Sequence, residues 1–434
     1  MRSLKRNRPN SGGVEASPGQ RLRQTTRLLR AEGASGVAAR LLNRAAARLT
    51  PSGFGQVAVA REDLVRAAEI AAAGWVLPGP APYSASEPMT VAWIAVPPHP
   101  GVGGHQTMFR MVGALEQAGH NCVLYLYDRH GWAMDQHIAT VRSGWPHIRA
   151  EVRSLQEGIE DAHALFATSW ETAYPALASS AAGARCYFVQ DFEPLFYPAG
   201  SEALLAEATY GFGFHGITAG KWLARKLHRE YGMSADHFDF GCDLDHYRLE
   251  RPDEAASGRS GICYYCRPGT PRRAYELAMM ALDLFAEMRP AVDIHLFGRP
   301  AGRVPFRATD HGLLTPPQLN TLYNRCVAGL CLSATNSSLV PHEMLGAGCI
   351  PVVNDAEHNR LVLDNPHIAY SPATPFHLAD TLRTLVDRPA DERNRGAIAA
   401  AESVRSTTWE QAGRQFEQAV RDVVQTRSAG ALAA

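Results

Sequence analysis

The sequence has no long apolar run, no dense set of cysteines and no net charge. No stretch of eighteen or more uncharged apolar residues occurs among the 434 residues, so no transmembrane helix is predicted. The first residues are rich in arginine and have no apolar segment of the kind found in a secretory signal. The chain has 43 basic and 43 acidic side chains, and we therefore expect no nucleic-acid partner.

The eight cysteines lie scattered in apolar, strand-like runs rather than at disulfide-framework spacing, which indicates a reducing, cytoplasmic setting. Cys263 and Cys266 form a CxxC pair, but no second Cys/His pair stands at zinc-site spacing. We therefore predict neither structural zinc nor redox chemistry, and no metal requirement.

The N-terminal region is strongly basic. Residues 1–50 contain eleven Arg or Lys and two Glu, and residues 1–20 have almost nothing to bury. Short basic amphipathic helices are expected after residue 20. Three interpretations stay open: peripheral binding to an anionic membrane at the inner face of the plasma membrane, an arm that packs on its own domain, and a mitochondrial presequence.

Two glycine-containing turns, some 160 residues apart, each lead from an apolar strand into a helix. The first runs from Val91–Val96 through Gly101–His105 into a helix expected at Thr107–Ala118. The second follows an apolar run from Ile262 and enters a helix expected at Arg272–Met288. Such turns let a phosphate approach the free N–H groups at a helix start. Two of them predict two Rossmann-like α/β domains that face a central cleft.

Alternation of strands and helices continues from residue 91 almost to the end, which predicts parallel sheets. We expect four regions: a basic helical extension and linker at 1–88, a first α/β domain at 89–248, a second at 249–406, and at 407–434 a helix that packs back on the first domain, followed by a tail. The helix elements read most directly are Glu62–Ala72, Lys221–Tyr231, Pro316–Arg325, and one from Thr408 to about Thr426.

From about Val91 to Gln425 the chain resembles retaining GT-B glycosyltransferases, and most of all the WsaF-type rhamnosyltransferases. The strings that carry this resemblance are PPHPGVGGHQTMFRM, YFVQDFEPLFYPAG, ITAGKWL, GCDLDHYR, YYCRPGTPRRAYEL, LSATNSSLVPHEMLGAGCIPVV and TTWEQAGRQFE. The resemblance implies a nucleotide-sugar donor held by the second domain, an acceptor held by the first, and catalysis without a metal. It also places GCDLDHYR (Gly241–Arg248) in the linker between the domains.

The second turn carries the expected diphosphate site. Arg267 and Arg272 stand five residues apart, where the family has an Arg and a Lys that touch the diphosphate, and Arg273 is adjacent. Guanidinium groups neutralise phosphates bidentately, whereas cations at a helix start otherwise oppose the helix dipole. A solvated helix start is the alternative to phosphate binding.

Other donor contacts are expected further along the second domain. Glu343 lies where the family has a glutamate that holds the ribose hydroxyls, although an ordinary first-turn glutamate is the alternative. Thr335 stands where the wider family has a glutamate that faces the donor sugar, which leaves the sugar open and fits a 6-deoxyhexose. The remaining expected contacts are Gly312, Ser338, Leu339 and Val340.

In the first domain Gly103, Gly104 and His105 are expected under the diphosphate, with His105 either donating to phosphate or capping the helix. Asp191 follows the apolar strand CYFVQ and is the first candidate to orient or deprotonate the acceptor hydroxyl, with Glu193 second. A turn aspartate is the structural alternative.

The sequence therefore predicts a hexosyltransferase, with rhamnosyl from dTDP-rhamnose as the first candidate and a polysaccharide or lipid-linked glycan as acceptor. A UDP- or GDP-sugar donor and a binding scaffold without turnover stay open. An NAD-type dehydrogenase is disfavoured, because neither turn gives GxGxxG with an acidic residue about twenty positions on.

Overall fold

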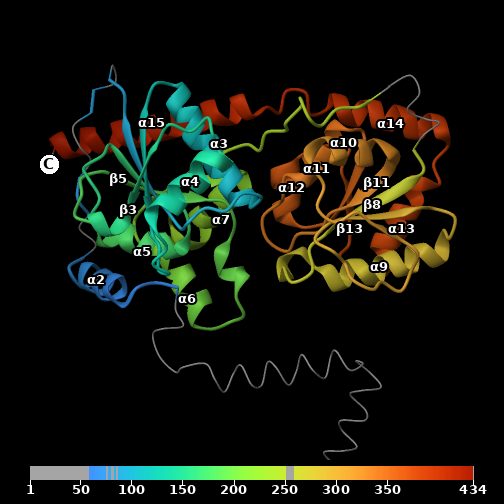
Figure 1. Cartoon of the computed structure of the whole chain (residues 1–434), viewed down its shortest axis with the longest axis horizontal. Coiled ribbons are helices and arrows are strands. Elements are labelled where there is room, and N and C mark those ends of the chain that lie inside the picture. The colour runs from blue at the N-terminus through green and yellow to red at the C-terminus, as the bar shows by residue number, and fades with distance from the viewer. Residues whose placement is uncertain (1–57, 75–76, 80–82, 85–86, 251–258, 434) are drawn as a thin grey trace, which may run out of the picture. The chain divides into compact units, whose positions relative to one another are not determined.

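The computed structural model describes residues 58–74, 77–79, 83–84, 87–250 and 259–433, with side chains to residue 428 (Figure 1). Two separate parallel sheets, each with helices, confirm the α/β prediction. The expected helix at Glu62–Ala72 is α2, Arg61–Ala72. The basic arm at residues 1–50 lies outside the described residues. Among the helices of the described part, none is long and apolar enough to span a membrane.

The first sheet has seven parallel strands in the order β3-β2-β1-β4-β5-β6-β7. Their bounds are β1 Thr90–Ala95, β2 Asn121–Leu126, β3 Glu151–Ser154, β4 Ala164–Ala167, β5 Ala184–Val189, β6 His215–Ala219 and β7 Ala235–Phe238. The central strands β4 and β5 are buried along their whole length, as expected when helices cover both faces. The edge strands β3 and β7 were not predicted, because each has four residues with polar side chains among them.

The helices of the first domain are α3 Gly103–Gln117, α4 Met134–Gly144, α5 Trp170–Ala178, α6 Ser201–Ala208 and α7 Lys221–Tyr231, with a short 3-10 turn η3 at Glu193–Phe196. Helix α7 has the bounds that the sequence predicts. Helix α3 begins at Gly103, four residues before the expected Thr107. The two glycines and His105 therefore form its first turn rather than a loop in front of it.

The second sheet has the order β10-β9-β8-β11-β12-β13. Its strands are β8 Gly261–Cys266, β9 Ile294–Gly298, β10 Thr309–Asp310, β11 Cys326–Leu330, β12 Ile350–Asn354 and β13 Ala369–Ser371. Its helices are α9 Tyr275–Met288, α10 Pro316–Arg325, α11 Val340–Gly346, α12 Glu357–Leu363, α13 Pro375–Val386 and α14 Ala390–Glu402. The predicted start of α9 at Arg272 is wrong: a 3-10 turn at Pro271–Arg273 and Ala274, with φ of 48°, precede the helix.

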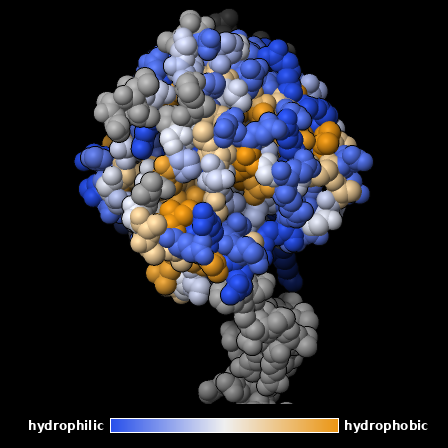
Figure 2. Space-filling view, turned by 90° about the vertical axis from the view of Figure 1, so that its left-hand side faces the viewer, coloured by the Kyte–Doolittle hydropathy of each residue, from blue (hydrophilic) through white to orange (hydrophobic). Residues whose placement is uncertain are grey.

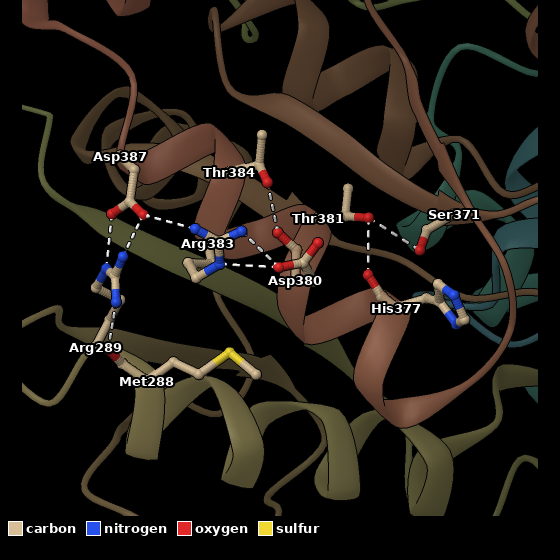
Figure 3. Close-up of polar contacts among 9 residues, drawn as sticks. All are labelled: Met288, Arg289, Ser371, His377, Asp380, Thr381, Arg383, Thr384 and Asp387. Atoms are coloured by element: carbon tan, nitrogen blue, oxygen red, sulfur yellow. Dashed lines mark hydrogen bonds and ion pairs between the residues drawn. The ribbon is translucent and has the colours of Figure 1, made fainter.

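Helices α9 and α13 are joined by a chain of ion pairs (Figure 3). Arg289, just after α9, pairs with Asp387, just after α13, and Arg383 pairs with both Asp380 and Asp387. In a parallel α/β sheet the ends of these helices lie at the amino edge of the strands. The chain of charges therefore fastens the outer helices at the edge opposite the carboxyl ends.

The last helix, α15 (Trp409–Ala433), packs against the first sheet rather than the second (Figure 1). Phe416 stacks on Trp93 with ring centroids 5.7 Å apart, inside the first domain's core. The Thr408 hydroxyl accepts the Gln411 N–H at 3.2 Å, which confirms the helix start expected at Thr408. The predicted boundaries near residues 88, 248 and 406 stay predictions.

The chain crosses between the domains twice, and the two crossings touch. Cys242 N–H donates to the carbonyl of Thr407 at 2.8 Å, and Cys242 and Thr408 form a parallel β-bridge. A Cβ on Gly241 would lie 2.5 Å from the backbone nitrogen of Trp409, so only glycine fits there. On the face shown in Figure 2, the apolar residues form small groups separated by hydrophilic ones.

Candidate functional site

Loops at the carboxyl ends of the two sheets contact each other, and these loops carry most of the predicted site residues. The first domain contributes the segment after β5 and the end of β6, and the second contributes the turn after β8 and the loop after β11. Parallel sheets bind ligands at this edge.

Arg272 has a guanidinium group whose donors are mostly unused. Its carbon lies 4.3 Å from the centre of the Phe196 ring, a cation–π contact that holds the side chain in place. Its buried Nε is 3.4 Å from Asp191 Oδ2, an ion pair without hydrogen-bond geometry, and has no hydrogen-bond partner. Burial lowers the pKa of Arg272. A cation held partly out of water with open donors attracts an anion.

The neighbouring arginines differ in how far the protein already uses them. Arg267 lies 5.8 Å from the centre of the Tyr265 ring, and no hydrogen bond to its guanidinium occurs within the described ranges. Arg273 donates from Nη1 to the Ser333 hydroxyl at 2.9 Å. Arg273 thus fixes the loop after β11, and Arg267 and Arg272 are the better candidates for phosphate contact.

The loop after β11 is held by a buried polar network. The Ser333 N–H donates to Asn354 Oδ1, the Asn354 amide donates to the Ser333 carbonyl, and His358 Nε2 donates to the same carbonyl at 2.8 Å. Thr335, 1% exposed, has a hydroxyl with no hydrogen-bond partner. A buried unsatisfied hydroxyl is rare in a folded protein. This loop therefore keeps unmet hydrogen-bonding capacity beside Arg272.

Three expected donor contacts, Ser338, Leu339 and Val340, lie at or just before the start of α11. Val340 is the first residue of α11. The Ser338 hydroxyl lies 3.3 Å from Cys331 Sγ. Leu339 packs against the core of the first domain. The Leu339 side chain therefore fills the contact between the domains, and only its backbone is left for a ligand.

Glu343 is partly buried on α11, and its Oε2 accepts a long hydrogen bond of 3.4 Å from the Tyr323 hydroxyl. Burial raises the pKa of Glu343 to about 7, against smaller lowering effects of Tyr323 and Arg110. Gly312, in the loop after β10, has φ of 60° and accepts the Gly298 N–H at 2.8 Å. It shapes the end of β9 through its backbone.

Asp191 is the meeting point of the two domains. Its Oδ1 accepts the backbone N–H groups of Phe192 and Asn336, each at 2.9 Å, and its Oδ2 faces Arg272. The first of these contacts is that of a turn aspartate, as the structural alternative expected. The other two come from the second domain. Asp191, the predicted acceptor residue, is therefore held in place by residues of the expected donor site.

Glu193, the second candidate base, has a different environment from the one expected. It is 7% exposed, and its Oε2 accepts the Trp170 N–H at 2.6 Å, at the start of α5. Desolvation by burial raises its pKa well above the usual value for glutamate. A carboxyl at a helix N-terminus is favoured by the free N–H groups there. Glu193 thus caps α5 inside the first domain, and its role as a candidate base stays a prediction.

The glycine-rich turn lies beside the same region. A Cβ on Gly104 would be 3.5 Å from the Gln190 side chain, whereas one on Gly103 would meet no atom within 4 Å. His105 Nδ1 accepts the His99 N–H at 2.9 Å, so neutral His105 carries its proton on Nε2. Burial lowers the pKa of His105. The ring is thus a donor from Nε2 rather than a cap for α3, which has no side-chain cap.

The sequence reasoning missed Asn336, which contacts Asp191, Gln190 and Ala219. The only signal was the cluster of small polar residues in the string SATNSS after β11. Within the described ranges, no group of three or more His, Cys, Asp or Glu side chains is placed to hold a metal ion.

Comparison with known proteins agrees with this arrangement. Residues 260–383 match the family model of the WsaF C-terminal domain. The chain is 33% identical over 321 residues to the O-antigen biosynthesis protein RfbC of Myxococcus xanthus, which covers 71% of this chain and 25% of RfbC. The chain thus spans about a quarter of the length of that curated relative.

Two solved structures share the fold at low sequence identity. Sucrose-phosphate synthase of Thermosynechococcus elongatus has a TM-score of 0.60 at 14% identity, with 78% of this chain and 100% of that chain covered. HepE of Anabaena, in complex with UDP and glucose, has a TM-score of 0.59 at 14% identity with the same coverage, 78% and 100%. Together with the two parallel sheets, these matches confirm the predicted two-domain architecture.

Proposed function

We propose that this chain, a WsaF-like protein of the GT-B fold, is a glycosyltransferase that builds an O-antigen or a related glycan. The proposed donor is a nucleotide diphosphate sugar, with dTDP-rhamnose as the first candidate, and the proposed acceptor is a polysaccharide or lipid-linked glycan. The match to RfbC, an O-antigen biosynthesis protein, supports the glycan class. The complex of HepE with UDP and glucose supports a donor of the nucleotide-sugar type.

The observation that carries the proposal is the state of Arg272. Its side chain is 30% exposed, its buried Nε has no hydrogen-bond partner among the described residues, and it lies at the carboxyl edge of the second sheet. Asp191 offsets its charge without hydrogen-bond geometry, so the guanidinium keeps donors that a bound anion can satisfy. A diphosphate supplies that anion, and Arg267 adds a second guanidinium close by.

In this mechanism Arg272 and Arg267 stabilise the diphosphate as it leaves, which is where negative charge grows in the transition state. The guanidinium groups provide the countercharge that a metal gives elsewhere, so transfer should persist in the presence of a chelator. The sugar carbon develops oxocarbenium character as its bond to phosphate breaks. His105 Nε2–H, across from the arginines, is a further donor to the diphosphate. Retention of configuration is expected from the WsaF resemblance.

The acceptor hydroxyl is assigned to the first domain, with Asp191 as the group that orients or deprotonates it. Asp191 Oδ2 faces Arg272. When a diphosphate draws Arg272 to itself, that oxygen becomes free to accept a hydrogen bond from the acceptor hydroxyl. Contact between the domains also keeps water from the reacting sugar.

Sugar-nucleotide binding followed by transfer tests the proposal. The melting temperature should rise with dTDP-rhamnose, UDP-glucose or a GDP-sugar according to the preferred donor, because a ligand of the native state stabilises it. Radiolabelled donors are then incubated with lipid-linked and polysaccharide acceptors. Failure of every sugar nucleotide to bind would overturn the assignment of the arginines.

A binding scaffold without turnover is the second candidate, and one residue favours it. Thr335 places a hydroxyl where the wider family has a carboxylate towards the sugar. Donor binding without hydrolysis or transfer to any acceptor would support the scaffold. Transfer of the sugar to any acceptor by the unmodified chain would exclude the scaffold.

The proposed location is cytoplasmic, with the basic residues 1–50 on an anionic membrane surface. The arm lies outside the described residues, so the proposal rests on its composition alone. Removal of residues 1–57 should leave nucleotide affinity unchanged and weaken sedimentation with phosphatidylglycerol vesicles, most strongly at low salt. Equal vesicle binding by the truncated and full chains would remove the membrane role.

A further inference from the structure

Asn336 uses both N–H donors of its side-chain amide in hydrogen bonds to the other domain. The residue is 1% exposed. Its Nδ2 donates to the carbonyls of Gln190 at 2.9 Å and Ala219 at 2.8 Å, and its Oδ1 accepts the Ser337 N–H at 3.0 Å. A loop residue of the second domain thus satisfies two main-chain carbonyls of the first.

The two carbonyls that Asn336 binds occupy equivalent places in the first sheet. Gln190 directly follows β5, and Ala219 is the last residue of β6. Carbonyls at the ends of neighbouring strands lose their ladder partners where the strands separate, so they need other donors. The primary amide of Asn336 has two N–H groups and supplies one to each carbonyl.

The backbone of Asn336 adds a third contact across the domains. Its N–H donates to Asp191 Oδ1 at 2.9 Å, and its own carbonyl accepts the Ser333 hydroxyl at 2.7 Å. The Ser333 hydroxyl in turn accepts a hydrogen bond from the guanidinium of Arg273. One residue therefore connects the proposed acceptor carboxylate to the loop beside the proposed diphosphate site.

A second contact near Asn336 fixes the same approach of the domains. A Cβ on Gly220, the residue after β6, would lie 2.9 Å from Val362 Cγ2 of α12. Gly220 has φ of 87°, a conformation that favours glycine. The backbone of the first domain thus comes close to α12 of the second domain, directly beside the Ala219 carbonyl that Asn336 binds. We infer that this packing sets the distance between the two domains and that Asn336 sets their alignment.

We propose that Asn336 is a positioning residue that aligns Asp191 with the donor loop whenever the two domains meet. This inference rests on the proposed function, because it assigns to Asn336 the alignment on which transfer depends. Asn336 itself acts through Asp191 and through the β5 and β6 carbonyls, and its amide has no free donor for substrate. Its loss should affect the transfer step rather than donor binding.

Steady-state kinetics of Asn336→Ala test the role in transfer. The turnover number should fall roughly tenfold or more, the scale of one or two lost buried hydrogen bonds, while the donor dissociation constant changes by less than about threefold. The share of donor lost to hydrolysis should rise relative to transfer, because the acceptor carboxylate is misaligned while the site still binds donor. Unchanged turnover, or a donor affinity that falls as much as turnover, overturns the proposal.

Asn365→Ala is the matched control. Asn365 donates from Nδ2 to the Ser403 hydroxyl and accepts the His367 N–H at Oδ1, each at 2.9 Å inside the second domain, so its replacement removes amide hydrogen bonds without touching the first domain. The control should lower the melting temperature without the change in the ratio of hydrolysis to transfer. An equal change in both variants would mean that the Asn336 effect is one of stability only, and would overturn the proposal.

A readout without substrate separates this inference from the proposed function. Asn336→Asp sets a carboxylate against two carbonyl oxygens, which repels them, whereas the parent amide attracts both. Small-angle X-ray scattering of the ligand-free chain should show a larger radius of gyration for Asn336→Asp than for the parent or Asn365→Ala. Equal scattering curves for all three overturn the positioning role of Asn336 even if transfer is observed. A larger radius supports it even if the parent transfers no sugar.

Discussion

The proposed site residues at the carboxyl edge of the second sheet and those of the first differ in how far the protein already bonds them. Among the described residues, Arg272 Nε and the Thr335 hydroxyl of the second domain are buried without hydrogen-bond partners. In the first domain Asp191, Glu193 and His105 each accept a backbone N–H. The second set therefore keeps hydrogen-bonding capacity for a ligand, whereas the first set is already bonded to the protein.

This difference bears on which residues bind a ligand and which take part in the reaction. An unsatisfied polar group beside a charged turn is a candidate for ligand binding, because a ligand that bonds it stabilises the native state. A carboxylate such as Asp191 already accepts two backbone N–H groups and faces Arg272. These contacts therefore support the proposed donor residues more directly than the proposed acceptor residues.

The largest expected effect comes from the first edge. Asp191→Asn keeps an oxygen for the N–H groups of Phe192 and Asn336 but removes charge and basicity, so turnover should fall roughly 100-fold or more. Donor affinity should stay close to that of the parent. Initial transfer rates with saturating donor measure this, and a rate equal to the parent's would transfer the role to another group such as the donor phosphate.

The second edge is tested by comparing two adjacent arginines. Arg272→Ala should weaken donor binding by about 2 kcal/mol, or roughly 30-fold, because it removes a charge-assisted contact from a partly desolvated site. Arg273→Ala should weaken it less, since Arg273 is already bonded to Ser333. Calorimetric titration with the nucleotide diphosphate gives both constants. Equal losses of donor affinity in the two variants would show that the hydrogen bond between Arg273 and Ser333 does not reduce the part that Arg273 takes in donor binding.

Glu343 provides a pH test of the same edge. Burial raises its pKa to about 7, so the carboxyl group expected to accept the ribose hydroxyls is mostly protonated at pH 6 and mostly ionised at pH 8. Donor affinity should rise roughly tenfold across that interval, in step with the ionised fraction. In Glu343→Gln the affinity should be lower at pH 8 and nearly independent of pH.

The same group should change the pH dependence of stability. A folded pKa above the usual value of 4.5 means that Glu343 favours the fold when protonated and destabilises it as pH rises from about 4.5 to 7. Replacement by Gln should therefore raise the melting temperature more at pH 8 than at pH 5. A larger gain at pH 5 would contradict the assigned shift.

The smallest expected effect sharpens the contrast within the first edge. Glu193→Gln keeps an acceptor for the Trp170 N–H and resembles the protonated form that burial favours, so turnover should change little. Glu193→Ala should lower stability by about 1 kcal/mol through the lost helix cap. Transfer rates per folded molecule measure the distinction, and a large loss in Glu193→Gln would restore Glu193 as a candidate base.

The sequence predicts those elements best that carry their own start and stop signals. Pro316–Arg325 was predicted to the residue because Thr315 and Gln318 form a capping box around it. Lys221–Tyr231 ends at Gly232 in the left-handed region, as expected for a helix stop. The strands β3 and β13, of four and three residues, exist because a neighbouring strand pairs with them, and no local pattern indicates that.

The site divides in the same way. The arginine turn and Glu343 are local patterns, and the sequence places them at the carboxyl edge of the second sheet. Asn336 depends on carbonyls 146 and 117 residues away, which no motif specifies. Glu193 follows Asp191 by two residues, yet the 3-10 turn η3 points its carboxyl to α5 instead. Such differences arise from tertiary packing rather than from local sequence.

Because α15 packs on the first sheet, the two domains cannot be separated or exchanged by a single cut in the chain. Phe416 and Val420 belong to the core that Trp93 organises, although more than three hundred residues separate them from it in sequence. A fragment that stops at residue 248 would therefore leave an uncovered apolar face on the first sheet. A chimera that receives its donor domain from a relative must exchange a segment bounded by the two touching crossings at Cys242 and Thr408, and keep the C-terminal helix from the same parent as the first domain.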